Sequence, residues 1–265
     1  MAKPLLLTAF IFLLLSCSNT SNRLQPVVSP LAITKDMMSW LYYDRDQMRW
    51  SADFNALDTA SRPMERKEFL SKLTTGNYLP VKMQSKDSSL CYQLYPLNNA
   101  VDKDVRETIK NKAQTVYSYL LLQGNKLPQF NFTDLNGNVY NAETTKGKIV
   151  ALNCWFIHCQ ACNEEMPELN KIVEQVKNRN DVVFVSLAFD KADSLKRFLT
   201  KKEFKYAVVP EKETYLRDDL GIVYYPTHII INRKGKIAKV IDGSVTELVD
   251  ALNEEFNTPG QPIKY

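Results

Sequence analysis

The second half of the chain alternates short, almost wholly apolar runs with longer segments whose apolar residues recur every three or four positions. The short runs predict strands that are buried on both faces, and the longer period predicts helices packed against them. The predicted strands cover residues 130–135, 139–140, 149–156, 182–189, 206–209, 227–231 and 236–241. The predicted helices contain residues 169–176, 195–199 and 245–256. This pattern is typical of an α/β domain with a central mixed sheet flanked by helices.

Turn and cap residues separate these elements. Asn136-Gly137 is a strong hairpin signal between two strands, and Asn232 to Gly235 marks a second hairpin near the end of the chain. Asp193 is a candidate N-cap for the middle helix. We therefore expect one domain over residues 126–265.

The segment before residue 125 has a different texture. Thr34 is a candidate cap for a helix whose apolar stripe reaches Leu57. The stripe consists of Trp40, Tyr43, Trp50, Phe54 and Leu57. Such stripes usually form core or docking surface, and a ligand box is the alternative.

The remaining predicted elements of this segment are a helix from Pro63 to Gly76, strands at 78–83 and 90–95, and a long helix from Asp102 or Asp104 to Gly124. Together they predict a small α+β module of unknown role over residues 18–125. No residues in it indicate a particular chemistry.

Residues 1–17 have the composition of an export signal. Lys3 precedes an apolar run from Leu5 to Leu15, which is shorter than the roughly 20 residues that a membrane-spanning helix needs. The run closes on Ser16-Cys17 and resembles a bacterial lipobox, in which the cysteine is lipidated and becomes the new N-terminus. An ordinary signal peptide cut nearby, with Cys17 incidental, is the alternative. Either one exports the chain.

The charge of the chain is spread evenly. The formal net charge is +4, from 34 Lys and Arg against 30 Asp and Glu, without a long basic block or a basic stripe interleaved with aromatics. We therefore predict that nucleic acid is not a partner.

The five cysteines indicate chemistry more than a stapled scaffold, because disulfide-stapled proteins carry more cysteines in shorter chains. Cys17 is assigned to the lipid, and Cys159 and Cys162 form the one close pair. Cys91 and Cys154 stand alone. Each is expected to be an inert buried thiol, and a bridge between them is the alternative.

The close pair lies where the predicted strand 149–156 passes into a helix. Cys159 therefore sits where free backbone N–H groups and the helix dipole favour negative charge, which stabilises its thiolate. Cys162 lies one turn further along and is less exposed, so we predict that Cys159 attacks and Cys162 resolves. Structural zinc is the alternative, but zinc normally takes four ligands and the sequence has no second CxxC or paired histidine. We predict neither a metal nor a cofactor.

The stretch from Leu127 to about Phe256 resembles the TlpA/ResA-like branch of the thioredoxin superfamily, also described as redoxin or AhpC/TSA-like. The matching residues are Leu127-Pro128, Asp134 to Asn138, Lys146-Gly147-Lys148, Asn153, Trp155, Cys159, Cys162, Glu165 to Leu169, Tyr225-Pro226-Thr227 and Gly235-Lys236-Ile237. The resemblance implies a thioredoxin fold for this half of the chain, with the N-terminal α+β module as an addition.

The resemblance also implies roles for residues around the pair. In this fold the proline at position 226 is cis and lies beside the two sulfurs, where it leaves a strand edge on which a partner polypeptide can pair. A proline that merely starts a strand is the alternative. The residues implied to tune the redox pair are Trp155, His158, Gln160 and Ala161.

Three residues differ from those that related proteins have at the same positions. Asn153 stands where cytoplasmic thioredoxins have a buried aspartate, so Glu165, three residues after Cys162, is the expected proton acceptor, with a plain helix acid as the alternative. A protonated His158, in place of the usual tryptophan, would stabilise the thiolate and make the disulfide more oxidising, or else it points to solvent. Cys154 replaces an apolar residue of the strand. An inert buried thiol is expected there, and a third redox partner of the pair is the alternative.

The resemblance implies an exported thiol-disulfide oxidoreductase. Members of this family commonly reduce envelope proteins such as apocytochromes c. We expect a lipid-anchored, periplasm-facing enzyme of the cell envelope that reduces protein disulfides and is recycled by a membrane thiol donor.

A thiol peroxidase is an alternative, although Phe156 stands where peroxiredoxins have Thr or Ser. A non-enzymatic lipid-anchored binding protein with a regulatory redox pair is another. His228 suggests a further alternative, in which this histidine and the two cysteines form a copper site like that of Sco-type chaperones. Those proteins space their cysteines differently, however.

Overall fold

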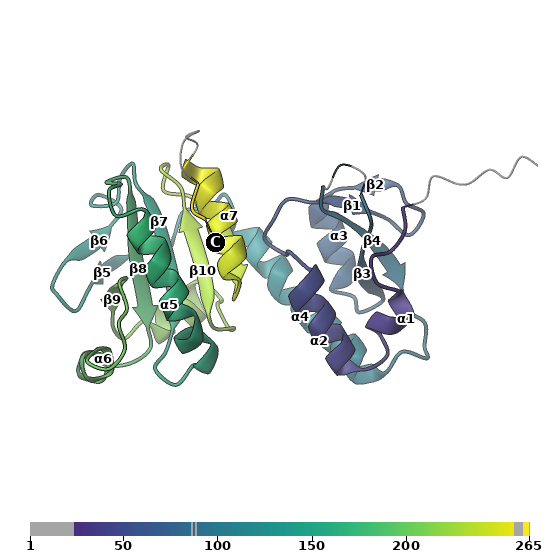
Figure 1. Cartoon of the computed structure of the whole chain (residues 1–265), viewed down its shortest axis with the longest axis horizontal. Helices are drawn as coiled ribbons and strands as arrows, with labels where there is room; N and C mark the ends of the chain where they lie inside the picture. The colour runs from purple at the N-terminus through teal and green to yellow at the C-terminus, as the bar shows by residue number, and fades with distance from the viewer. Residues whose placement is uncertain (1–23, 86, 88, 257–261, 265) are drawn as a thin grey trace, which may run out of the picture.

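A computed structural model of the chain describes residues 24–85, 87, 89–256 and 262–264. It shows two larger β-sheets side by side, each packed against helices, and a separate two-stranded sheet (Figure 1). The predicted signal segment 1–17, with the proposed lipidation site Cys17, lies outside the described residues. Within the part of the chain that is described, no helix has the length and apolar character needed to cross a membrane.

The larger sheet lies in the C-terminal half and has the strand order β11-β10-β7-β8-β9. Its strands are β7 (Ile149–Trp155), β8 (Val182–Ala188), β9 (Ala207–Val209), β10 (Thr227–Ile231) and β11 (Ile237–Asp242). Strands β7, β8 and β9 are parallel, whereas β10 is antiparallel to both β7 and β11. This mixed sheet, with the strand that leads to the paired cysteines at its centre, is the predicted thioredoxin fold.

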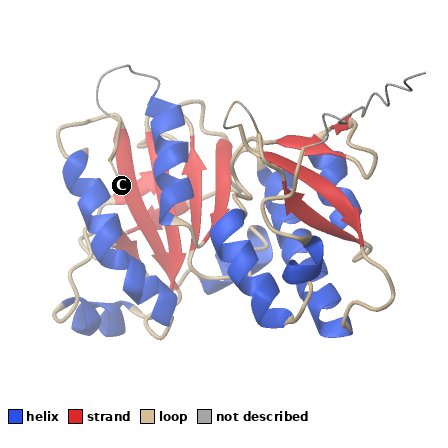
Figure 2. Cartoon of the chain, turned by 45° about the vertical axis from the view of Figure 1, so that its right-hand side comes forward, coloured by secondary structure: helices blue, strands red, loops and turns tan. Residues whose placement is uncertain are grey.

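β7 is buried along its whole length because both of its faces are covered. One face, here called the α5 face, packs against α5 (Gln160–Gln175), α6 (Ala192–Leu199) and α7 (Val245–Phe256). The opposite α4 face is covered by the hairpin β5 (Asn131–Thr133) and β6 (Val139–Asn141), a π-helical turn at Tyr215–Asp219 and the end of α4. Figure 2 shows the helices packed along the strands of both sheets.

The smaller sheet lies in the N-terminal half and has the order β2-β1-β4-β3. Its strands are β1 (Asn55–Leu57), β2 (Pro63–Met64), β3 (Tyr78–Lys82) and β4 (Cys91–Pro96). The helices of this half are α1 (Pro30–Ile33), α2 (Met37–Gln47), α3 (Arg66–Leu73) and α4 (Lys103–Leu122). They enclose a core of their own around Trp40, Phe69 and Tyr92. The expected additional α+β module is therefore present.

Helix α4 belongs to both halves of the molecule. Its first turns, with Val105 and Ile109, pack into the N-terminal core, whereas Tyr119 packs into the α4 face of the larger sheet. Asp102 caps the helix by accepting the N–H of Asp104 at 2.8 Å. After the helix the N–H of Gly124 donates to the carbonyl of Ile237 in β11 at 2.8 Å. One long helix thus links the two sheets.

The aromatic helix predicted from Thr34 to Leu57 is wrong at both ends. Asp36 caps α2, because its carboxylate accepts the N–H of Ser39 at 2.7 Å. The helix ends at Gln47, and Leu57 lies in β1. Residues of α2 and β1 pack against the same core. Their apolar positions in the sequence therefore resembled one face of a single long helix.

Several shorter elements also differ from the prediction. Pro63 lies in β2, and α3 begins only at Arg66. Lys191 stands at the N-cap position of α6, so Asp193 lies inside its first turn. The π-helical turn at Tyr215–Asp219 was not predicted, because such a short element has no resolvable apolar period.

Candidate active site

The paired cysteines lie at the junction of β7 and α5. They form a disulfide, Cys159 is the N-cap residue of α5, and Cys162 lies in its first turn. The backbone N–H of Cys162 donates to Cys159 Sγ at 3.2 Å, which places this sulfur at the positive end of the helix dipole. The predicted strand-to-helix position of the pair is confirmed.

The two cysteine residues differ slightly in their exposure to solvent. Cys159 is 7% exposed and Cys162 is 1% exposed. A partner disulfide can therefore approach Cys159 more readily than Cys162.

The loop that carries the pair is held by hydrogen bonds from two sides. Asp190, which follows β8, accepts the N–H of Ile157 through Oδ2 at 2.8 Å. Asn163 of α5 donates through Nδ2 to the carbonyl of Ile157 at 2.8 Å. Because both the N–H and the carbonyl of Ile157 are bonded to side chains, the loop before Cys159 is held in place from both sides.

Pro226 lies at the same end of the sheet. The Tyr225–Pro226 peptide bond is cis, and β10 begins directly after it. Thr227 pairs with Cys154 at the end of β7, so the strand after Pro226 begins where β7 runs into the cysteine loop. Tyr225 also contacts Phe156 of that loop, with the ring centroids 5.9 Å apart. The two loops thus form one surface.

The residues predicted to tune the redox pair fall into two groups. Trp155 is fully buried and packs edge-on against Phe204, with the ring centroids 5.6 Å apart. His158, Gln160 and Ala161 are exposed. Of the two positions open to His158, the structure shows the ring on the solvent side.

Below the pair lies a buried cluster of three polar side chains on the α5 face. Asn153 Nδ2 donates to Glu165 Oε1 at 2.9 Å, and His228 Nε2 lies 3.2 Å from Glu165 Oε2. Asn153 Nδ2 also lies 3.3 Å from His228 Nδ1. Glu165 is therefore a buried group bonded to two partners, in contrast to an exposed helix acid.

Sequence reasoning singled out Glu165 but did not connect it with His228. The two residues are far apart in the sequence, and only the strand register brings them together, because His228 pairs with Asn153 across β10 and β7. A signal was present in the sequence, since a histidine inside an otherwise apolar strand needs a buried hydrogen-bond partner.

Comparisons with known proteins agree with this geometry. Residues 123–240 match the AhpC/TSA family, beginning directly after α4. ResA, a thiol-disulfide oxidoreductase of Bacillus thuringiensis subsp. konkukian, is 31% identical over 125 residues, which are 47% of this chain and 72% of the relative. ResA of Halalkalibacterium halodurans is 31% identical over 133 residues, 50% of this chain and 74% of the relative. The chain belongs to the ResA family of thiol-disulfide oxidoreductases.

Among solved structures, the thioredoxin domain of a thiol-disulfide oxidoreductase from Bacteroides vulgatus is 23% identical. It covers 51% of this chain and 98% of its own, with a TM-score of 0.45.

The two remaining described cysteines of this ResA-family chain are free and buried, so the alternative of a bridge between them is wrong. Cys91 lies in the N-terminal core and Cys154 on the α4 face of the larger sheet. Burial raises the pKa of both thiols, and for Cys154 the charge of Glu165 adds to the effect. Both are therefore poor nucleophiles at neutral pH.

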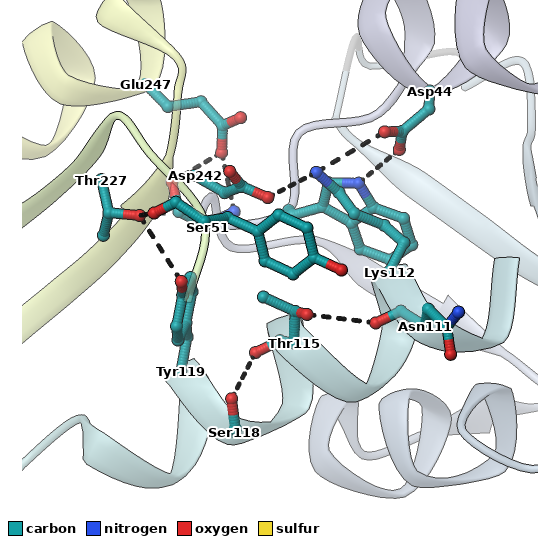
Figure 3. A network of polar contacts seen from close by, with 12 residues as sticks. Asp44, Ser51, Asn111, Lys112, Thr115, Ser118, Tyr119, Thr227, Asp242 and Glu247 are labelled. Carbon is teal, nitrogen blue, oxygen red and sulfur yellow. Dashed lines mark hydrogen bonds and ion pairs between the residues drawn. The ribbon is translucent and has the colours of Figure 1, made fainter. Parts of the chain in front are cut away.

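A polar network fixes the N-terminal module on the thioredoxin-like half of this family member (Figure 3). Lys112 Nζ of α4 lies 2.7 Å from Asp242 Oδ2 in β11 and 3.5 Å from Asp44 Oδ2 in α2. Glu247 Oε2 in the first turn of α7 accepts both the N–H of Ser51, at 2.7 Å, and its hydroxyl, at 2.6 Å. The two halves are thus joined by ion pairs between half-buried side chains and by hydrogen bonds to the buried Glu247.

Proposed function

We propose that this oxidoreductase reduces protein disulfides through Cys159 and Cys162. The observation that supports the proposal best is the pair itself, with the more exposed cysteine at the start of α5 and the cis-Pro226 loop at the same end of the sheet. A helix N-terminus stabilises a thiolate, and a thiolate is the form that attacks a disulfide.

The proposed reaction has two exchange steps. Cys159 attacks a partner disulfide and forms a mixed disulfide, while the partner's backbone pairs with the strand edge beside Pro226. Cys162 then attacks Cys159, which closes the internal disulfide and releases the partner as a dithiol. Glu165 accepts the proton of Cys162 in this second step.

We also propose where the reaction takes place. The segment 1–17 supports export, and Cys17 supports a lipid anchor that holds the enzyme at a membrane of the cell envelope, facing the periplasm. Each turnover leaves the pair oxidised, so a thiol donor in the membrane would return it to the dithiol form. Residues 18–125 would form a module of their own, whose role is unknown.

Trapping tests the proposed roles of the two cysteines. A Cys162→Ser chain should accumulate mixed disulfides through Cys159, since the resolving thiol is missing. Cys159→Ser should capture nothing, and Cys154→Ser, which changes an equally buried thiol outside the pair, is the matched control. If Cys162→Ser traps no partner protein in the cell envelope, the proposed function is wrong.

The reduction potential tests the proposed direction. A value of about −270 mV for the Cys159–Cys162 couple is typical of thioredoxin-like reductants, and about −120 mV is typical of strong oxidants. We expect a value near the first. Rapid consumption of peroxide by the reduced protein would instead favour the peroxidase alternative.

A further inference from the structure

His228 carries an inference that deepens the proposed function and rests on it. The side chain is fully buried in β10, and its ring nitrogens face Asn153 of β7 and Glu165 of α5. The sequence contains two histidines, and the other, His158, is exposed. Burying an ionisable ring costs free energy unless its polar atoms are bonded, so the partners of His228 define its state.

The contacts assign the proton of the ring. Asn153 Nδ2 donates to Glu165 Oε1 at 2.9 Å and lies 3.3 Å from His228 Nδ1. An amide nitrogen only donates, so Nδ1 accepts and has no proton of its own. The neutral ring then has its proton on Nε2, which donates to Glu165 Oε2 at 3.2 Å.

The carboxylate of Glu165 thus receives a hydrogen bond on each oxygen. Such bonds favour the charged form of a carboxylate, whereas burial disfavours it. Without the bond from His228, Glu165 Oε2 would lose the contact that fixes its orientation.

We propose that His228 is a positioning residue that holds the Glu165 carboxylate where it can accept the proton of Cys162. Glu165 lies three residues after Cys162 on α5, and residues at this spacing share one face of a helix. Both side chains are buried.

The step that depends on this contact is the release of the partner. The proton of Cys162 passes to Glu165, and the Cys162 sulfur attacks Cys159 Sγ in the mixed disulfide. The Cys159–Cys162 bond forms and the bond to the partner breaks. The partner sulfur leaves with the bonding electron pair as a thiolate, which is protonated by solvent.

Other titratable groups near Glu165 stay neutral. Burial, with the charge of Glu165 adding to it, raises the pKa of Cys154 on β7 and the pKa of the Tyr206 hydroxyl just before β9. Neither group exchanges a proton at neutral pH. His228 and Cys162 are therefore the neighbours whose protons matter to Glu165.

A single-turnover experiment tests the proposal in the full chain with Cys17→Ser. The reduced protein is mixed with dithiobis(nitrobenzoate), which reacts with Cys159, and the second coloured thiolate reports its release by Cys162. In His228→Leu the pH profile of this release should lie several-fold below that of the wild type, because the carboxylate that accepts the proton is no longer held in place. His228→Gln can still donate to Glu165 and should restore the wild-type profile.

Glu165→Gln provides the matched background. Once the carboxylate is absent, adding His228→Leu should not slow the release further. An equal slowing in this background, or an unmoved profile in a folded His228→Leu protein, would overturn the proposal. The small probe needs no protein substrate, so these results are independent of whether the enzyme reduces protein disulfides.

A second measurement needs no variant at position 228. Nitrogen NMR of the wild-type protein at neutral pH should show a neutral His228 ring with its proton on Nε2. A charged ring, or a proton on Nδ1, would contradict the assignment, even if His228→Leu does not fold.

Discussion

Tyr119 Oη lies 3.4 Å from Thr227 Oγ1, which joins the end of α4 to the residue that follows cis-Pro226 (Figure 3). The Thr227 hydroxyl donates in turn to the carbonyl of Tyr224 at 2.8 Å, so the hydroxyl of Tyr119 is the donor of the longer bond. The N-terminal half of the molecule therefore contacts the proline loop through the same helix that fills its own core.

This contact predicts a difference between two substitutions of Tyr119. Tyr119→Phe removes one long hydrogen bond, and Thr227 keeps its bond to Tyr224, so the free energy of unfolding should fall by less than about 1 kcal/mol. Tyr119→Ala also removes a ring that is 3% exposed from the core of the α4 face, and should cost about 3 kcal/mol. Urea unfolding measures both. Equal losses would mean that the hydroxyl carries the whole effect.

The ion pairs of Lys112 predict a larger loss than an ordinary surface lysine. Lys112→Met would leave Asp44 and Asp242 facing each other without a cation, and their side chains are only 16% and 19% exposed. We expect the free energy of unfolding to fall by about 2 kcal/mol, less than for a fully buried pair. Lys110→Met, on the same helix, removes an i,i+3 pair with Glu107 and is the control, with an expected loss below about 0.5 kcal/mol. Similar losses for the two variants would contradict the proposed role of Lys112.

Sequence patterns predicted the larger sheet well because its strands are buried on both faces. The runs at 149–156, 182–189 and 227–231 differ from the observed strands by at most one residue at one end. In such strands nearly every side chain is apolar, so the pattern does not depend on which face meets which neighbour.

The N-terminal half was harder to predict, because its elements are short and share one core. Trp40 in α2 and Leu57 in β1 lie at helical spacing in the sequence although they belong to different elements. The candidate site divides in the same way. Cys159, Cys162 and Glu165 lie close together in the sequence, at the N-cap and in the first turns of α5, and were found there, whereas His228 reaches Glu165 only through the register of β10 with β7.

The stability contribution of Lys112 should depend on pH in one direction. Burial lowers the pKa of Lys112, but the charges of Asp44 and Asp242 outweigh it, so the pKa in the folded chain lies above its usual 10.5. The folded state then binds the proton more tightly, and the contribution is complete below pH 10.5 and lost as the pH rises past the folded pKa. The difference in unfolding free energy between wild type and Lys112→Met should stay constant from about pH 7 to pH 9. A difference that disappears in that range would show that the carboxylates do not hold the charge.

The described cysteines should react with iodoacetamide in two groups once the pair is reduced. Cys159 should be labelled first in the native protein, since it is the more exposed of the pair and its sulfur lies at the start of α5. Cys91 and Cys154 should be labelled only after unfolding, because burial excludes the reagent and raises their pKa, which removes the reactive thiolate. Mass spectrometry of peptides, with and without urea, separates the sites, and Cys159→Ser is the control. Native labelling of Cys154 as fast as that of Cys159 would instead support a third redox thiol.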